Sequence, residues 1–307
     1  MGDTGKIPGA VNQPLASPSG GRAAGRITMQ SEWLNHQLTD QERKVFDRDG
    51  YFLVENAISE ETVERANAAV DRLIAAYRDQ EGLAENARIN YLDFIGRDRE
   101  FMDLLDCPTT FPKVWNILGW NIQLYHSHLI WTPPLQPGEP DPGYNWHKDS
   151  GRLNQELETD PQPRISLKVA YFLTDTSVPG RANLYVVPGS HLTNKLEDIV
   201  DGQPRGGMPV LAKPGTAVFF DRRIFHASSP NTSDVTRKVL FYGYSYRWLR
   251  PRDDMRIEGW LDDADPIQKQ LLGISLSGGH GYSSPQEEDV PLRAWMREQL
   301  GSASVPA

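Results

Sequence analysis

From about residue 120 onward, the sequence is a series of short apolar segments separated by clusters rich in Pro, Gly, Asn, Asp and Ser. The segments read NIQLYHSHLIW, RISLKVAYFLTD, NLYVVPGSH, GTAVFFD, RIFHA and RKVLFYGYSYRWL. Short apolar segments bounded by turn residues predict strands. Because no helical pattern alternates with them, we expect a mainly β fold with flanking helices: an antiparallel sandwich or jelly roll.

The preceding segment predicts helices. Thr39 has Glu42 three residues later, which is the pattern of a capping box, and Ser59 starts a second helix. YFLV between them predicts a short strand. The second helix has one apolar face at helical spacing, which we expect to be buried, made of Val63, Ala66, Val70, Leu73, Ile74 and Tyr77.

The chain divides into a single domain and two tails. Residues 1–30 contain repeated Gly and Pro and no aromatic residue, so we expect a disordered N-terminal tail. Residues 31–300 are interpreted as a single domain without internal repeats, and residues 301–307 as a C-terminal tail. Near the end, we expect one helix from Asp265 and Pro266 to Gly273, and another from Asp289.

Charge and composition exclude several classes of protein. A formal net charge of −9 argues against binding to nucleic acid or to an anionic membrane, because both favour a basic surface. One cysteine rules out an internal disulfide framework. No apolar run reaches membrane-spanning length, and the N-terminus lacks the pattern of a secretory signal. The cytoplasm is the expected location.

The stretch YNWHKDSG is the first candidate for a site. On a strand, His147 and Asp149 point to the same face about 6.6 Å apart, whereas a helix would separate them. They can therefore supply an imidazole and a carboxylate to one metal ion. A lone H-x-D is also common by chance, so a structural histidine beside a solvated aspartate is the alternative until other residues join the pair.

A third ligand has five histidine candidates: His126, His128, His191, His226 and His280. His280 lies in a glycine-rich loop and His191 ends a strand-to-turn signal, so structural roles are favoured for both. His226 is favoured as the ligand. It lies on one predicted strand of a hairpin whose turn is SPNTSD, and we expect it roughly opposite Arg237 on the other strand. Arginine would suit a carboxylate ligand, because its planar fork donates two parallel hydrogen bonds.

With these residues, the sequence resembles the phytanoyl-CoA dioxygenase family of iron(II) and 2-oxoglutarate dependent oxygenases, which includes ectoine hydroxylases. The resemblance extends from about residue 38 to 300, through LTDQERKVFDRDGYFLVENAIS, LYHSHLIWTPP, WHKDSG, LKVAYFLTD, LYVVPGSH, PGTAVFFD, His226, Ser228 and Arg237. It implies a double-stranded β-helix, or cupin-like jelly roll, with iron on His147, Asp149 and His226. It also implies that Arg237, assisted by Ser228, binds the distal carboxylate of 2-oxoglutarate, and that O2 is the oxidant.

Two positions depart from the family pattern. Several relatives have a lysine where this chain has Thr132, so a second cationic contact to 2-oxoglutarate is missing there. His126 or Lys168 could supply a polar contact instead, and a purely structural role for each remains open. The second departure is Ala182, where the pattern favours glycine; we expect it to change only local backbone freedom.

The resemblance implies hydroxylation of a C–H bond with release of succinate and CO2, and Asp149 argues against the related halogenases, which lack this carboxylate. Desaturation, cyclisation and epoxidation remain alternatives, as do a zinc hydrolase using the same three residues and a catalytically silent jelly-roll binding protein. We expect a small-molecule substrate, bounded by loops 132–145 and 150–164 that could form a lid. Trp146, Arg152 and Asn183 are candidate substrate or lid residues, and the protein is expected to be a monomer or homodimer.

Overall fold

The helices before the sheet form where the sequence predicts them. The structure, a computed structural model, describes residues 30–196, 199–200 and 203–305, so the predicted tail 1–30 lies outside the described residues except for Gln30. Helix α2 (Asp40–Asp49) begins with a complete capping box between Thr39 and Glu42. Helix α3 (Glu60–Glu81) begins at Ser59, whose hydroxyl accepts a hydrogen bond from the Thr62 amide, and its predicted apolar face is buried or partly buried. Both predictions are confirmed.

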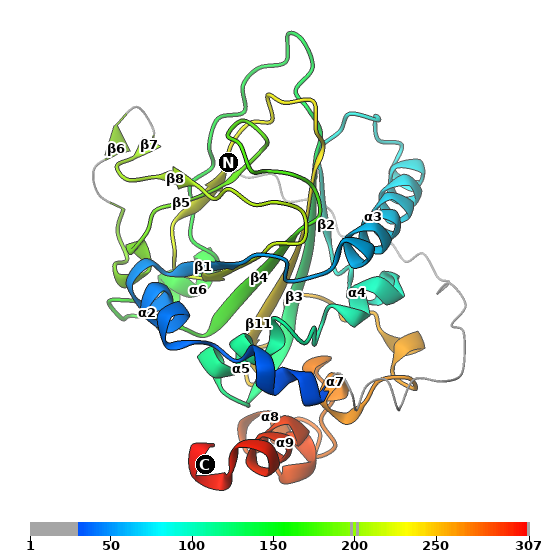
Figure 1. Ribbon diagram of the computed structural model, residues 1–307, viewed down its shortest axis with the longest axis vertical. Coiled ribbons are helices and arrows are strands. Elements are labelled where there is room, and N and C mark those ends of the chain that lie inside the picture. The colour runs from blue at the N-terminus through cyan, green and yellow to red at the C-terminus, as the bar shows by residue number, and fades with distance from the viewer. Residues whose placement is uncertain (1–29, 197–198, 201–202, 306–307) are drawn as a thin grey trace.

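Six strands of the described chain form one antiparallel sheet in the order β1-β9-β4-β11-β3-β2 (Figure 1). Its strands are β1 (Tyr51–Val54), β2 (Ile89–Leu92), β3 (Ile122–Thr132), β4 (Ser166–Phe172), β9 (Ala217–Asp221) and β11 (Arg237–Tyr246). Five of these match the apolar segments of the sequence. β2 is the exception, because Asn90 interrupts INYL and polar residues flank it, so that no apolar segment stands out.

A smaller antiparallel sheet contains β10 (His226–Ser228), β5 (Leu184–Val186) and β8 (Met208–Pro209) in that order. Strands β6 (Ile199–Val200) and β7 (Gln203–Pro204) pair separately. Apolar residues of both sheets form one buried cluster, to which the large sheet contributes Ala170 and Phe241 and the small sheet Leu184 and Val186. The face of the large sheet that carries this cluster is called the inner face below.

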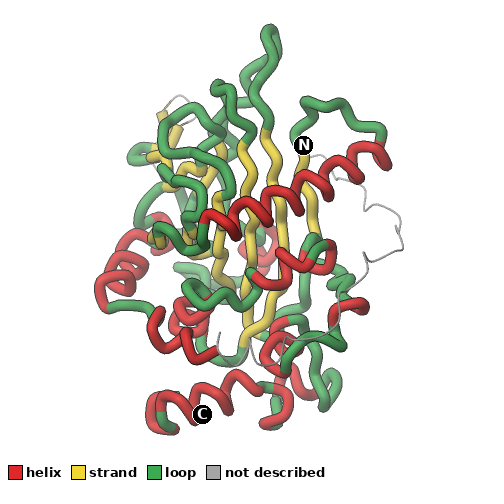
Figure 2. The backbone as a smooth tube through the Cα atoms, turned by 45° about the vertical axis from the view of Figure 1, so that its right-hand side comes forward, coloured by secondary structure: helices red, strands yellow, loops and turns green. Residues whose placement is uncertain are grey.

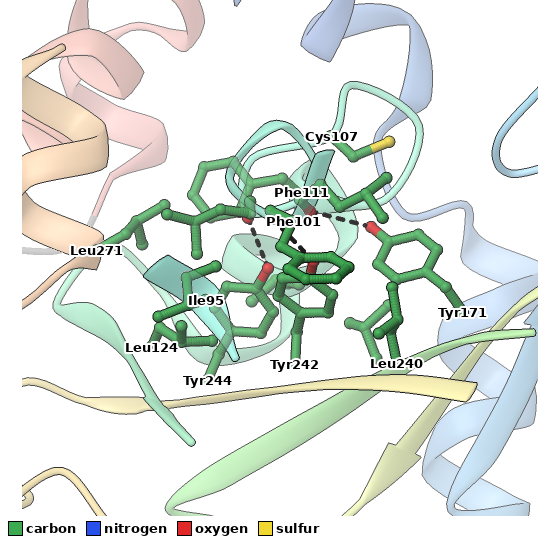
Figure 3. Close-up of a cluster of buried hydrophobic side chains, with 14 of the residues drawn as sticks. Ile95, Phe101, Cys107, Phe111, Leu124, Tyr171, Leu240, Tyr242, Tyr244 and Leu271 are labelled. Carbon is green, nitrogen blue, oxygen red and sulfur yellow. Dashed lines mark hydrogen bonds between the residues drawn. The ribbon is translucent and has the colours of Figure 1, made fainter. Parts of the chain in front are cut away.

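The opposite, outer face of the large sheet packs against helices, and α3 lies across its strands (Figure 2). Tyr171, Tyr242 and Tyr244 project from this face and are buried. Their hydroxyls form hydrogen bonds with the segment that contains α4 (Arg99–Asp103) and α5 (Phe111–Leu118). Tyr242 donates to Phe101 O at 2.8 Å, and Tyr244 donates to Leu105 O at 2.6 Å (Figure 3). These bonds satisfy buried polar groups and fix the helices against the sheet.

An irregularity in the pairing of β3 with β11 places two consecutive side chains beside Gly243. The register shifts between Gly243 and Tyr244, so that Gly243 pairs with His126 while Tyr244 pairs with Leu124. Tyr125 is the extra residue, as in a β-bulge. A Cβ on Gly243 would lie 2.8 Å from a ring carbon of Tyr125, so any larger residue would displace this ring.

The C-terminal region packs against the lower end of the sheet in Figure 1. It contains α7 (Pro266–Leu271), α8 (His280–Ser283) and α9 (Pro291–Leu300); α6 (Gly151–Glu156) lies apart from them, in the loop after Asp149. The helix expected from Asp289 begins instead at Pro291, because the Asp289 carboxylate accepts bonds from the Ser277 and Gln286 amides. Val305, within the predicted C-terminal tail, is buried in the core.

The predicted hairpin between His226 and Arg237 was wrong. Strand β10, which carries His226, pairs with β5 in the small sheet, whereas β11, which carries Arg237, pairs with β3 and β4 in the large one. The SPNTSD segment therefore connects the two sheets rather than two paired strands. No helix in the described residues is long and apolar enough to cross a membrane.

Candidate metal centre and cosubstrate site

Three side chains converge next to the small sheet. The ligand atoms of His147, Asp149 and His226 all lie within 4.8 Å of one another, and they form the one such group of metal-binding side chains in the described chain. His147 reaches His226 through an isolated antiparallel bridge, in which each amide donates to the other's carbonyl, at 3.0 and 2.9 Å. The Asp149 amide donates to Arg222 O at 3.1 Å. His147 and Asp149, which were expected on a strand, are thus held by isolated backbone hydrogen bonds and do not belong to a regular strand.

Each histidine is oriented by a backbone carbonyl. His147 Nδ1 lies 2.8 Å from Asn145 O, and His226 Nδ1 lies 3.0 Å from Ile224 O. A carbonyl only accepts, so Nδ1 of each ring is the protonated nitrogen and Nε2 keeps a free electron pair. A carbonyl bonded to the other ring nitrogen is the usual support of a metal-binding histidine. Burial also lowers the pKa of His226 to about 4, which keeps this imidazole neutral.

The carboxylate of Asp149 is buried, with 8% of the residue exposed. Burial alone would raise its pKa, but the Lys168 ammonium and the neighbouring histidines outweigh this effect and hold the pKa below its usual range. Its Oδ2 atom lies 2.9 Å from the Lys168 ammonium and has no further hydrogen-bond partner among the described residues. Two imidazoles and an ionised carboxylate fit a divalent metal of the iron type, which such a set binds with positions left open.

A second group lies at the start of β11. Arg237 is 1% exposed, pairs with Thr132 of β3, and donates from Nη1 to the Ser228 hydroxyl at 3.4 Å. Its Nε and Nη2 atoms, and Thr132 Oγ1, are buried without a partner among the described residues. Burial, and then repulsion from Arg88, lowers the pKa of Arg237 to about 9. Free donors on a buried guanidinium fit a carboxylate ligand.

Comparisons with known proteins identify the family of this chain. Residues 46–239 match the family model described as phytanoyl-CoA dioxygenase (PhyH), which covers more than half of the chain. The chain belongs to the phytanoyl-CoA dioxygenase family. It is therefore a 2-oxoglutarate-dependent dioxygenase with iron as its metal. An ectoine dioxygenase from Nocardia farcinica is 26% identical over 237 residues, which cover 67% of this chain and 77% of that relative.

Solved structures show the same fold. HygX from Streptomyces hygroscopicus, with nickel and 2-oxoglutarate bound, superposes with a TM-score of 0.57 at 15% identity over 70% of this chain and 90% of that one. The 2-oxoglutarate-dependent carbocyclase SnoK from nogalamycin biosynthesis gives a TM-score of 0.53 at 22% identity, over 75% of this chain and 92% of that one.

The other predicted cosubstrate residues lie further along the sheet. His126 and Lys168 both pair with Gly243, whereas Arg237 pairs with Thr132 near the opposite end of the same strands. Lys168 contacts Asp149, at the metal end. His126 Nδ1 lies 2.7 Å from Asp253, and its Nε2 is buried without a partner among the described residues. Of the three candidates for the second contact, Thr132 is thus the one beside Arg237.

The candidate lid residues differ in their surroundings. Trp146 stacks on Tyr144 and donates to Gln203 Oε1 at 3.0 Å. The Arg152 side chain is 80% exposed and pairs with Glu156 in α6. The Asn183 side-chain amide is buried and donates to Thr176 O and Val178 O. Its donors therefore hold the loop before β5 in place. Ala182, beside it, has a φ of 51°, the conformation for which glycine was expected.

Sequence reasoning missed two kinds of residue. The carbonyls of Asn145 and Ile224 orient the rings of His147 and His226, and nothing in a side-chain pattern marks a carbonyl. Asp253 lies in a run of charged residues that indicates no site, yet its side chain is 1% exposed and bonds to His126 and Ser127. The histidine that contacts Asp253 is His126 of β3, which is buried. A histidine within this apolar segment was the one sequence signal of a buried polar partner.

Proposed function

We propose that this dioxygenase hydroxylates an unactivated C–H bond of a small metabolite, and that its two sheets are the double-stranded β-helix of the iron and 2-oxoglutarate oxygenases. The observation that carries the proposal is the link between two sites through strand β10. This strand carries His226, one of the three converging metal-ligand candidates, and Ser228, whose hydroxyl accepts a hydrogen bond from the buried Arg237 with its unpaired donors.

The residues divide the task between them. His147, Asp149 and His226 would hold the iron, through Nε2 of each ring and the carboxylate of Asp149. Arg237 and Ser228 would hold the distal carboxylate, which fixes the direction of the cosubstrate between the sheets. Iron, 2-oxoglutarate and dioxygen together supply the oxidation, in which the cosubstrate leaves as succinate and carbon dioxide.

Burial of the site also contributes to the proposed reaction. Phe220 and Phe241 flank Lys168 on the inner face, and the cation lies 5.8 and 5.7 Å from their ring centroids. Apolar walls of this kind exclude water and prevent oxidation of anything except the bound substrate. They also strengthen the contact between Lys168 and Asp149.

Cyclisation is a second candidate outcome, because the carbocyclase SnoK shares the fold. A zinc hydrolase is disfavoured, since hydrolysis would leave the unpaired donors of Arg237 without a purpose. The choice between hydroxylation and cyclisation depends on how the substrate lies over the metal.

The test uses the purified full chain. Anaerobic addition of 2-oxoglutarate to the Fe(II)-loaded protein should produce the visible charge-transfer band of a chelated keto acid. Release of succinate in air would then confirm turnover of the cosubstrate. A screen of small metabolites by mass spectrometry would distinguish the products: a gain of one oxygen indicates hydroxylation, and a loss of two hydrogens indicates cyclisation or desaturation. A protein that binds zinc but neither iron nor 2-oxoglutarate would refute the proposal.

A further inference from the structure

One arginine outside the sites described so far lies level with Arg237 across the sheet. Ile89 of β2 pairs with Trp131 of β3, and both pack against the outer cluster. Alternation along a strand therefore turns Arg88, the residue before β2, to the inner face beside Thr132. Thr132 pairs in turn with Arg237. Arg88, Thr132 and Arg237 thus form a row across three adjacent strands.

The row contains two positive charges and no negative one. Among the described residues, Arg237 contacts the Ser228 hydroxyl and the Phe172 ring, and neither arginine is within ion-pair distance of a carboxylate. Arg88 is exposed, yet the surrounding protein lowers the pKa of its guanidinium by desolvation. Repulsion from Arg88 also contributes to the lowered pKa of Arg237. Two like charges held close together in a partly desolvated place need a counter-ion.

Resting on the proposed function, we infer that Arg88 is a second cationic contact for the distal carboxylate of 2-oxoglutarate, acting across Thr132 from Arg237. A carboxylate has two oxygens with about four acceptor positions, so two guanidiniums can bind it from different sides. Arg237, which is buried, would fix the position of the carboxylate. Arg88, which reaches solvent, would add charge and cover the carboxylate once it is bound.

The other cations of the inner face are less well placed for this role. Lys168 is hydrogen-bonded to Asp149 at the metal end of the sheet. His126 pairs with Gly243 and is bonded to Asp253, and burial holds its pKa well below the ordinary value, so it carries no charge to offer. Thr132 can donate one hydroxyl hydrogen bond but has no charge. Arg88 is therefore the cation that the register brings to Arg237.

The experiment compares two keto acids. Calorimetric titration of the anaerobic Fe(II)-loaded protein would measure the binding of 2-oxoglutarate and of pyruvate, which has the same keto acid end but no distal carboxylate. Arg88→Met should weaken 2-oxoglutarate binding about tenfold or more, the effect of losing one charge-assisted hydrogen bond, and leave pyruvate unchanged. Arg88→Lys, which keeps the charge, should retain part of the affinity. Arg250→Met, at another exposed arginine, is the matched control and should bind like wild type.

Two results would overturn the inference. Equal 2-oxoglutarate affinity in Arg88→Met and wild type, together with weaker binding in Arg237→Met, would show that Arg237 acts without Arg88. An equal loss for 2-oxoglutarate and pyruvate would show that Arg88 supports the fold instead of the carboxylate. Failure of the wild-type protein to bind 2-oxoglutarate at all would refute the proposed function itself, which is a separate outcome.

Discussion

The Lys168 ammonium lies 2.9 Å from both carboxylate oxygens of Asp149, and both side chains are less than a tenth exposed. The lysine therefore supplies the positive charge that this buried carboxylate needs before a metal binds. Removing one partner of a buried ion pair leaves an uncompensated charge, which costs about 3 kcal/mol or more.

We predict that Lys168→Met destabilises the metal-free protein by about this amount. The loss should be much smaller in the Fe(II)-loaded protein, because the metal replaces the missing charge. Thermal unfolding with and without Fe(II) would measure both, with Lys213→Met, on the exposed surface, as the control. An equal loss in the two forms would mean that Lys168 contributes packing and not charge.

Replacing His147, Asp149 or His226 by alanine should abolish turnover and iron binding while the fold persists, because open-site ligands contribute more to the metal than to the core. Iron content by elemental analysis and secondary structure by circular dichroism would be measured together. His280→Ala, at the exposed first residue of α8, should match wild type. A variant that keeps both its iron and its activity would remove that residue from the ligand set.

Arg237→Lys should raise the KM for 2-oxoglutarate at least tenfold with little effect on the affinity for the organic substrate, because lysine cannot form the paired hydrogen bonds of a guanidinium. Succinate formation at varied 2-oxoglutarate concentration gives this KM. An unchanged value would place the distal carboxylate elsewhere.

Thr132→Lys tests whether the second cationic position is already filled. Next to Arg88 and Arg237, a third positive charge should weaken 2-oxoglutarate binding through repulsion and desolvation. In the Arg88→Met background, the same lysine should instead strengthen binding. The four affinities form a double-mutant cycle; a gain of affinity in both backgrounds would show that Arg88 and Thr132 act independently.

Asp93 and Asp253 make stability depend on pH. Desolvation, and then the charge of Asp253, raises the pKa of Asp93 to about 6, and desolvation likewise raises the pKa of Asp253 to about 6. The folded pKa of Asp93 is above its unfolded value of 3.8, so the folded state favours the protonated form and loses stability as pH rises from about 4 through 6.

Asp93→Asn should therefore raise the unfolding temperature at pH 7 and have little effect near pH 4. Neither carboxylate oxygen of Asp93 has a hydrogen-bond partner among the described residues, and asparagine tolerates its positive φ of 58°. Chemical or thermal unfolding from pH 4 to 7 would show the difference. Asp79→Asn, on the exposed face of α3, is the matched control.

Local signals in the sequence predicted much of the fold. Thr39 and Ser59 start helices because their caps require only residues a few positions away, and the long apolar strands β3, β4 and β11 are marked by their own composition. The convergence of His147 and Asp149, two of the proposed metal ligands, could be expected for a related reason, since they are near neighbours in the chain.

Pairing between distant segments could not be predicted in the same way. A hairpin between His226 and Arg237 is the natural expectation for two strands joined by turn residues, yet His226 pairs with Val186 and Arg237 with Thr132. Which strand a given strand pairs with depends on how both faces of each sheet are buried. The residues of a short connection do not show whether it joins two paired strands or crosses from one sheet to the other. The contact between Lys168 and Asp149 and the position of Arg88 beside Thr132 both depend on which strands pair. The sequence therefore predicted neither of them.

The order of strands in the large sheet has a consequence for biosynthesis. β1 and β2, the strands made earliest, lie at its two edges, and their partners β9 and β3 are joined through β4 and β11. β11 ends at Tyr246, so the sheet cannot be completed until this residue has left the ribosome. Until then, apolar strands such as β3 and β4 lack their central neighbour and are exposed to aggregation. We expect the growing chain to depend on chaperones, and expression at lower temperature to increase the yield of folded protein.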